Sequence, residues 1–170
     1  FVSNDYTQGK KVSVAIEREL RHCDAFYISV AFITEGGLAP LKQVLAELRD
    51  KGIPGKILTT SYLTFTEPKA LKTLADLSNV EVRVYDSTDE GASGFHTKGY
   101  IFKEEEIYRF IVGSSNMTAS AFSVNKEWNT KLVSTSDGEL LKQMMTEFNA
   151  LWNSKHTLAV KDFIEDYEVR

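Results

Sequence analysis

Side chains that can act on a phosphate diester recur in three short segments in the second half of the chain. His96 and Lys98 stand two residues apart, Ser114 and Asn116 belong to the segment Gly-Ser-Ser-Asn, and Glu127 follows further along. In a strand, residues two apart point to the same side, so His96 and Lys98 are expected to project together. The second arm of a hairpin would return Ser114 and Asn116 beside them. We therefore expect an imidazole, an ammonium, a hydroxyl and an amide in one small volume.

This set of groups suits the hydrolysis of a phosphate diester. A neutral nitrogen of His96 can attack phosphorus and form a covalent intermediate. Lys98, Ser114 and Asn116 can hold the non-bridging oxygens as charge shifts in the transition state. The Glu127 carboxylate is a suitable acceptor for the proton of the other ring nitrogen, and such a bond would set the tautomer of His96.

The elements that must position these residues alternate between helices and strands. Apolar residues at helical spacing predict helices at residues 12–20, 38–48, 68–77, 119–122 and 140–152. Runs rich in β-branched and aromatic residues predict strands at residues 25–32, 56–60, 80–85, 97–102, 108–112 and 128–134. The run Glu104 to Glu106 is expected to be the solvated turn of the hairpin. We predict an α/β fold, with a mixed, largely parallel sheet flanked by helices on both faces, in a single domain over residues 1–170.

The composition fits a soluble domain. The 170 residues include 20 Lys and Arg against 24 Asp and Glu, giving a net charge of −4, and 42% are hydrophobic. No apolar run approaches the roughly 18 residues of a membrane helix, and the first residues do not resemble a signal peptide. The single Cys23 and the three histidines offer no zinc-type spacing, so we expect no metal and no other cofactor. We expect a cytoplasmic protein with no membrane partner.

The segments His-Thr-Lys and Gly-Ser-Ser-Asn, followed by a glutamate, resemble the phospholipase D superfamily. The resemblance implies a phospholipase D-like fold, with His96 as nucleophile, Lys98 and Asn116 as phosphate ligands, Ser114 as a supporting hydrogen-bonding group and Glu127 as the partner of the histidine. It also implies a mechanism without a metal ion. Many members carry an acidic residue five positions after the lysine, where this chain has Lys103. In the nuclease-like branch a later carboxylate replaces it, and Glu127 would fill that role.

The resemblance extends from about Ala25 to Trp152. Segments such as SVAFITEGGL, GFHTKGYIF and GSSNMTASAFSVNKEWN, in this order, are similar to the phospholipase D-like domain at the N-terminus of bacterial superfamily 2 helicase-type proteins. Similar domains occur in restriction endonucleases that cut DNA without metal. The resemblance implies a nuclease acting on DNA, and we expect the chain to be part of a longer protein with a helicase or ATPase domain. Because the chain holds one His-x-Lys segment and the family mechanism needs two histidines, we expect a homodimer that shares its active site.

Other interpretations of these residues are open at this stage. A catalytically silent DNA-binding or regulatory module would keep the fold and the phosphate pocket, and a true phospholipase is a further alternative. Ser114 to Asn116 could form a turn or cap the next helix, and Glu127 could be a solvated strand residue. His22 and His156 are expected to be structural. Met144 and Met145 are expected to pack in the core, although one half of their stripe could meet a second subunit.

Overall fold

The computed structural model describes residues 1–5, 8–61, 66–92, 97–160 and 162. Its helices are α1 (Val12–His22), α2 (Glu35–Leu38), the 3-10 helix η2 (Ala39–Leu41), α3 (Lys42–Lys51), α4 (Pro68–Ala75), α5 (Ala119–Ser123) and α6 (Glu139–Trp152). Its strands are β1 (Ala25–Val30), β2 (Gly55–Thr60), β3 (Val80–Tyr85), β4 (Lys98–Glu104), β5 (Ile107–Gly113), β6 (Asn129–Thr135) and β7 (Thr157–Ala159). All the predicted strands and helices are present with small shifts in their ends, except that the helix predicted at 38–48 is divided.

The strands form one mixed sheet with the order β6-β5-β4-β1-β2-β3-β7. The pairs β1–β2 and β2–β3 are parallel, as the alternation of strands and helices predicts. Four of the six neighbouring pairs in the described part of the chain are antiparallel, so the prediction of a largely parallel sheet is wrong. The reason is that the hairpin β4–β5 enters beside β1 in the opposite direction and β6 continues it, while β7 returns along β3.

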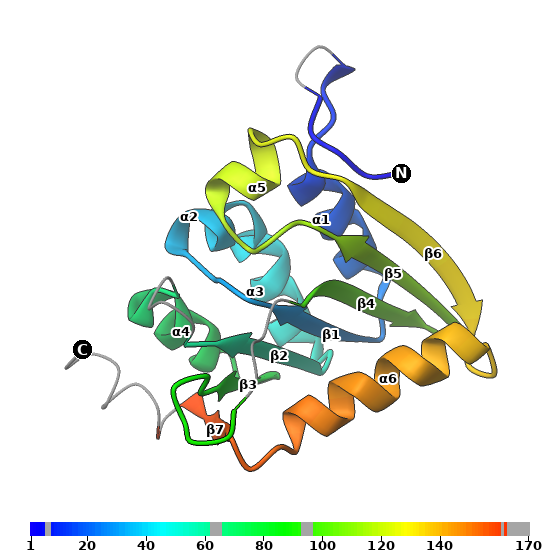
Figure 1. Cartoon of the computed structure of the whole chain (residues 1–170). Coiled ribbons are helices and arrows are strands. Elements are labelled where there is room, and N and C mark those ends of the chain that lie inside the picture. Colours follow the sequence, from blue (N-terminus) through cyan, green and yellow to red (C-terminus); the bar gives the residue numbers. More distant parts are fainter. Residues whose placement is uncertain (6–7, 62–65, 93–96, 161, 163–170) are drawn as a thin grey trace.

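Helices cover both faces of this sheet, as predicted. In Figure 1, α6 crosses one face alone, while α1 to α5 lie on the other side. Successive residues of β1 point to opposite faces of the sheet. Phe26 and Ile28 join Ile16 of α1 in the larger core. Tyr27 points to α6 and meets Phe148 edge-on, with ring centroids 5.8 Å apart. Full burial of such a side chain stabilises the fold by about 1.5–3 kcal/mol. The α6 helix is therefore fastened to the sheet by its apolar stripe.

Local sequence signals explain where several elements begin and end. Gly52 adopts the left-handed conformation (φ 70°) that ends α3, and Pro68 occupies the first turn of α4, where a missing N–H costs nothing. Glu105 has a φ of 54° in the predicted hairpin turn. The helix predicted at 38–48 is divided, because the short η2 segment around Pro40 separates α2 from α3.

The short edge strand β7 was not predicted, because its three residues give no periodic signal. It follows α6, whose last turn is held by Arg83: the guanidinium donates to the Trp152 carbonyl (3.0 Å) and lies 4.4 Å from the indole centroid. His156 nearby is buried, with its Nδ1 3.0 Å from the Asp89 carboxylate. The structural interpretation of His156 is thus confirmed.

Candidate active site

Four of the five predicted site residues meet at one end of the sheet. Lys98 opens β4 opposite Val30, the last residue of β1. Gly113 closes β5 opposite Asn129, the first residue of β6, so that Ser114 and Glu127 flank this pair. The ends of β1 and β5 and the starts of β4 and β6 therefore gather Lys98, Ser114, Asn116 and Glu127. The fifth residue, His96, lies outside the described residues.

Ser114 and Glu127 are in direct contact. The Ser114 hydroxyl donates to Glu127 Oε2 (2.9 Å) and accepts from the Trp128 backbone N–H (3.1 Å), while the Ser114 N–H donates to the Trp128 carbonyl (3.2 Å). Glu127 is 9% exposed and precedes β6, so the interpretation as a solvated strand residue is wrong. One carboxylate oxygen is held by Ser114, and this bond orients the other.

Asn116 is fixed against the end of β1. Its Oδ1 accepts from the backbone N–H groups of Ala31 and Phe32, both at 3.1 Å. Because both partners are donors, the amide can have only this orientation, and its Nδ2 is the end that faces away from them. No hydrogen bond of this Nδ2 to the described residues is recorded. Asn116 is thus a fixed N–H donor at the same strand end as Lys98.

The alternative that Ser114 to Asn116 cap a helix is wrong. The cap of α5 is Thr118, whose side chain accepts from the Ala121 N–H at 3.2 Å. Ser115, between the two predicted ligands, is fully buried; its hydroxyl accepts from Asn129 Nδ2 (2.9 Å) and its carbonyl from the Tyr100 hydroxyl (2.9 Å). Burial raises the pKa of Tyr100 well above its ordinary value, so this phenol stays a donor.

Sequence reasoning missed several groups that hold this end of the sheet. Besides Tyr100 and Asn129, the hydroxyls of Ser29 and Thr97 lie 2.5 Å apart beside Lys98. Ser29 is a polar residue in a largely apolar strand, and this feature of the sequence could have indicated that it belongs to the site. Tyr100 and Asn129 gave none, because an aromatic or amide residue in a strand is ordinary.

Two glycines let the backbone approach closely here. A Cβ on Gly113 would lie 2.1 Å from the Trp128 carbonyl oxygen, and one on Gly37 would lie 2.0 Å from that of Met117. Gly36 and Gly37 belong to α2, whose cap is Thr34. Gly37 allows the segment after Asn116 to pack against this helix.

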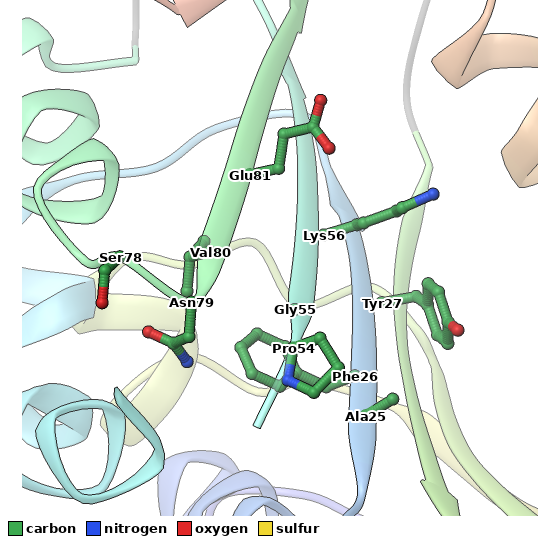
Figure 2. A pocket seen from close by; sticks show the side chains of 10 residues that line it. All are labelled: Ala25, Phe26, Tyr27, Pro54, Gly55, Lys56, Ser78, Asn79, Val80 and Glu81. Carbon is green, nitrogen blue, oxygen red and sulfur yellow. The ribbon is translucent and has the colours of Figure 1, made fainter. Parts of the chain in front are cut away.

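Two hollows occur near the ends of the central strands. One, of about 510 Å³, lies between the sheet and α6 and is lined by Ser29, Thr97, Lys98 and Gly113 as well as by α6 side chains such as Met144. The other, of about 240 Å³, lies at the opposite ends of β1, β2 and β3, where Lys56, Asn79 and Glu81 surround it (Figure 2). None of the predicted site residues lines the second hollow. Of the four described site residues, Lys98 alone lines the first hollow.

Two further findings concern the described residues alone. In that part of the chain, no group of three or more His, Cys, Asp and Glu residues could hold a metal ion. No described helix is both long and apolar enough to cross a membrane.

The arrangement can bind an anionic group through two donors. The Lys98 ammonium and the Asn116 amide supply donors at one strand end, and a carboxylate held by a hydroxyl stands on the next strand. These groups suit a phosphoryl oxygen and a histidine that must carry a proton.

Comparison with known proteins agrees with this chemistry. The family described as "Cardiolipin synthase, PLD-like domain" matches residues 21–152. The fold is similar to that of Nuc, a phospholipase D family member from Salmonella typhimurium (TM-score 0.67, 17% identity, 92% of this chain and 95% of that chain). It is also similar to NucT from Helicobacter pylori (TM-score 0.66, 14% identity, 92% and 95%). A further similar structure is phosphatidylserine synthase from Haemophilus influenzae (TM-score 0.62, 15% identity, 95% of this chain and 43% of that chain). None of the curated proteins matches this chain.

The class that emerges is a phosphodiesterase-type hydrolase. The chain belongs to the phospholipase D-like family whose model covers residues 21–152. The expected resemblance to the phospholipase D superfamily is thereby confirmed.

Proposed function

We propose that this protein is a metal-independent nuclease that hydrolyses DNA through a phosphohistidine on His96, in a site shared by two copies of the chain. The observation that carries the proposal is the contact of Ser114 with Glu127 beside Lys98 and Asn116, at one end of a phospholipase D-like sheet. This is the group of residues that the His-x-Lys and Gly-Ser-Ser-Asn segments predict.

The proposed reaction has two steps. A neutral His96 nitrogen forms a bond to phosphorus, the bond to the leaving oxygen breaks, and a protonated His96 of the second copy gives its proton to that oxygen. Water then forms a bond to phosphorus as the P–N bond breaks, and the second histidine takes up the proton of the water. Lys98 and Asn116 Nδ2 hold the non-bridging oxygens throughout. Glu127 accepts from the other His96 nitrogen and stabilises the imidazolium that develops.

The α6 face supports the proposed dimer. Along α6, Leu140, Met144 and Leu151 line the hollow of about 510 Å³ that also reaches Lys98, and the Leu140 side chain is 47% exposed. A two-fold axis near this face would bring the Lys98 regions of two copies together and cover the exposed apolar side chains. Met144 and Met145 both pack against the core, as predicted. Sedimentation at micromolar concentration is expected to show a dimer, and a strict monomer would contradict the shared site.

The identity of the substrate and the neighbouring domain rest on the family resemblance. The segments from Ala25 to Trp152 are similar to domains at the N-terminus of superfamily 2 helicase-type proteins. We therefore propose DNA as substrate and a helicase or ATPase domain in the full-length protein. Residues 1–170 would then be its single phospholipase D-like domain. The preference for a nuclease over a phospholipase rests on the same segments, because similar folds occur in Nuc and NucT and also in a phosphatidylserine synthase.

The test is hydrolysis of labelled single- and double-stranded DNA in EDTA by the wild type and by His96→Ala. We expect cleavage by the wild type alone, and an alkaline quench should reveal phosphohistidine by mass spectrometry. The rate should follow a bell-shaped pH profile, because one histidine must be neutral and the other protonated. Activity that EDTA abolishes and Mg²⁺ restores would contradict the mechanism. Binding without cleavage by the wild type would instead indicate a silent DNA-binding module.

A further inference from the structure

Two exposed aromatic side chains stand beside the active site. The Trp128 side chain is 75% exposed and that of Phe1 is 82% exposed, and the two rings meet edge-on with their centroids 6.3 Å apart. Large aromatic residues are normally well buried, because each removes 150–250 Å² of surface from water when it packs. An exposed pair of this kind indicates a contact surface.

The backbone of Trp128 is part of the active site. Its N–H donates to the Ser114 hydroxyl and its carbonyl accepts from the Ser114 N–H, at 3.1 Å and 3.2 Å. The preceding residue is Glu127, whose carboxylate bonds the same hydroxyl at 2.9 Å. The position from which the indole projects is therefore fixed by Ser114, the residue that also holds the Glu127 carboxylate.

A hollow of about 390 Å³ adjoins the indole. It is lined by Phe1, Val124, Lys126, Glu127 and Trp128, together with the polar side of residues 3–5. Glu127 is common to this hollow and to the bond with Ser114, so the two sites are one side chain apart. We call this space the Trp128 hollow.

The chemistry of the Trp128 hollow fits a nucleobase. The indole offers a flat face for stacking, and Lys126 offers a cation for an adjacent phosphate. A lipid chain would need a continuous apolar wall, whereas five of the eight residues that line this hollow are polar or charged. A base is aromatic and also carries donors and acceptors.

We propose that Trp128 is a stacking platform for an unpaired base next to the scissile phosphate, and that it makes the protein prefer single-stranded DNA. This proposal rests on the proposed nuclease function and adds the form of the substrate to it. A base within a duplex is stacked on its neighbours and cannot lie on the indole without leaving the helix. A base in a single strand meets no such cost.

The fluorescence of the protein allows a direct test. The chain has two tryptophans, and Trp152 is only 3% exposed, so quenching by a bound base reports on Trp128. His96→Ala protein is titrated with a short single-stranded oligodeoxynucleotide and with the same strand carrying abasic sites. We expect quenching by the first strand, little by the abasic strand, and weaker binding of the matching duplex.

Substitutions of Trp128 show whether binding depends on an aromatic ring or only on an apolar side chain of similar size. Trp128→Leu should weaken single-strand binding about tenfold or more, whereas Trp128→Phe should retain most of the affinity and lose the quenching signal. Val133→Ala, at a 63% exposed apolar residue of β6, the strand that follows Trp128, is the control and should leave binding unchanged. Thermal denaturation checks that each variant folds.

The outcomes distinguish the two proposals. If the wild type cleaves DNA but Trp128→Leu binds as tightly as the wild type, stacking is wrong and the nuclease stands. If the wild type neither binds nor cleaves DNA, the proposed function itself fails. If Trp128→Leu instead converts a dimer to a monomer, the indole belongs to a contact between chains, and the platform is wrong.

Discussion

The two ends of the central strands are closed in different ways. At the amino end, backbone meets backbone: the Phe26 N–H donates to the Pro54 carbonyl (3.1 Å) and the Gly55 N–H to the Asn79 carbonyl (3.0 Å). At the carboxyl end of β1, a side chain takes this role, since Asn116 Oδ1 accepts from the Ala31 and Phe32 N–H groups. Both ends have a hollow, so a hollow by itself does not identify the active site.

The difference shows how a site can be built from strand ends. Backbone closure leaves Lys56 and Glu81 beside the hollow of Figure 2, together with buried apolar residues such as Phe26. Closure by Asn116 leaves an oriented amide donor at the surface, and closure of β5 by Ser114 leaves an oriented carboxylate on Glu127. Groups that are held in place before the substrate arrives need no reorganisation during reaction.

The largest contrast is expected between two glycine substitutions. In Gly113→Ala the new Cβ would meet the Trp128 carbonyl at 2.1 Å, and that backbone cannot move without disturbing Ser114. We expect hydrolysis to be lost. In Gly55→Ala the Cβ would lie 2.0 Å from the tip of the Phe26 ring, and a shift of this ring can relieve part of the clash. We expect the usual cost of overpacking, about 1–3 kcal/mol of stability.

Thermal denaturation and the hydrolysis rate per folded molecule measure both variants. Gly55→Ala should lower the melting temperature and keep the rate. A Gly113→Ala protein that cleaves DNA like the wild type would contradict the proposed role of the β5–β6 junction.

The second contrast concerns two glutamates. Glu127→Gln keeps an acceptor oxygen for Ser114 but removes the negative charge that is proposed to stabilise the His96 imidazolium, and we expect the rate to fall about 100-fold with little change in melting temperature. Because a carboxylate raises the pKa of a neighbouring histidine, its loss should move the acid limb of the pH–rate profile to lower pH. Glu81→Gln at the other end breaks only an exposed pair with Arg83 and should leave the rate unchanged. An unaltered rate and profile in Glu127→Gln would assign the residue a structural role.

The third contrast compares two asparagines. Asn116→Ala leaves two strand-end N–H groups without their acceptor, which costs about 1–3 kcal/mol for each group that water cannot reach. Asn79→Ala loses one bond to the Ile53 carbonyl, but also removes a buried Oδ1 that has no partner among the described residues. We expect a clear loss of stability and a higher KM only for Asn116→Ala. Denaturant unfolding measures the stability of the two variants, and steady-state kinetics measures their KM. Equal losses in Asn116→Ala and Asn79→Ala would contradict the difference between the two ends.

The smallest effect is expected at Cys23, just before β1. Burial raises the pKa of this thiol to about 12. A free thiol ionises near pH 8.5, so the folded protein should react far more slowly with a thiol reagent at pH 8 than the unfolded protein. The unfolded thiol ionises above about pH 8.5 while the folded one stays protonated, and stability should therefore fall as the pH rises beyond that value. Rapid labelling of Cys23 in the native protein would contradict this prediction and show that the structure opens at the amino ends of the central strands.

The sequence by itself determined the elements and the segments that carry the chemistry. The alternation in VEVRVY predicts β3, the stripe from Leu140 to Trp152 predicts α6, and the charged run around Glu105 predicts the hairpin turn. These signals are local, since hydrophobic periodicity and turn chemistry act over a few residues. The hairpin also implied that Lys98 and the Gly-Ser-Ser-Asn segment meet.

Only the tertiary structure decided how these pieces are joined. It placed β4 antiparallel beside β1, brought Asn116 to the Ala31 and Phe32 amides, and set Trp128 next to the active site. Each contact joins residues that are far apart in the chain, and an asparagine or an exposed tryptophan has the same local pattern wherever its partner lies. Strand order depends on how whole faces are buried, and a short window of sequence does not record that balance.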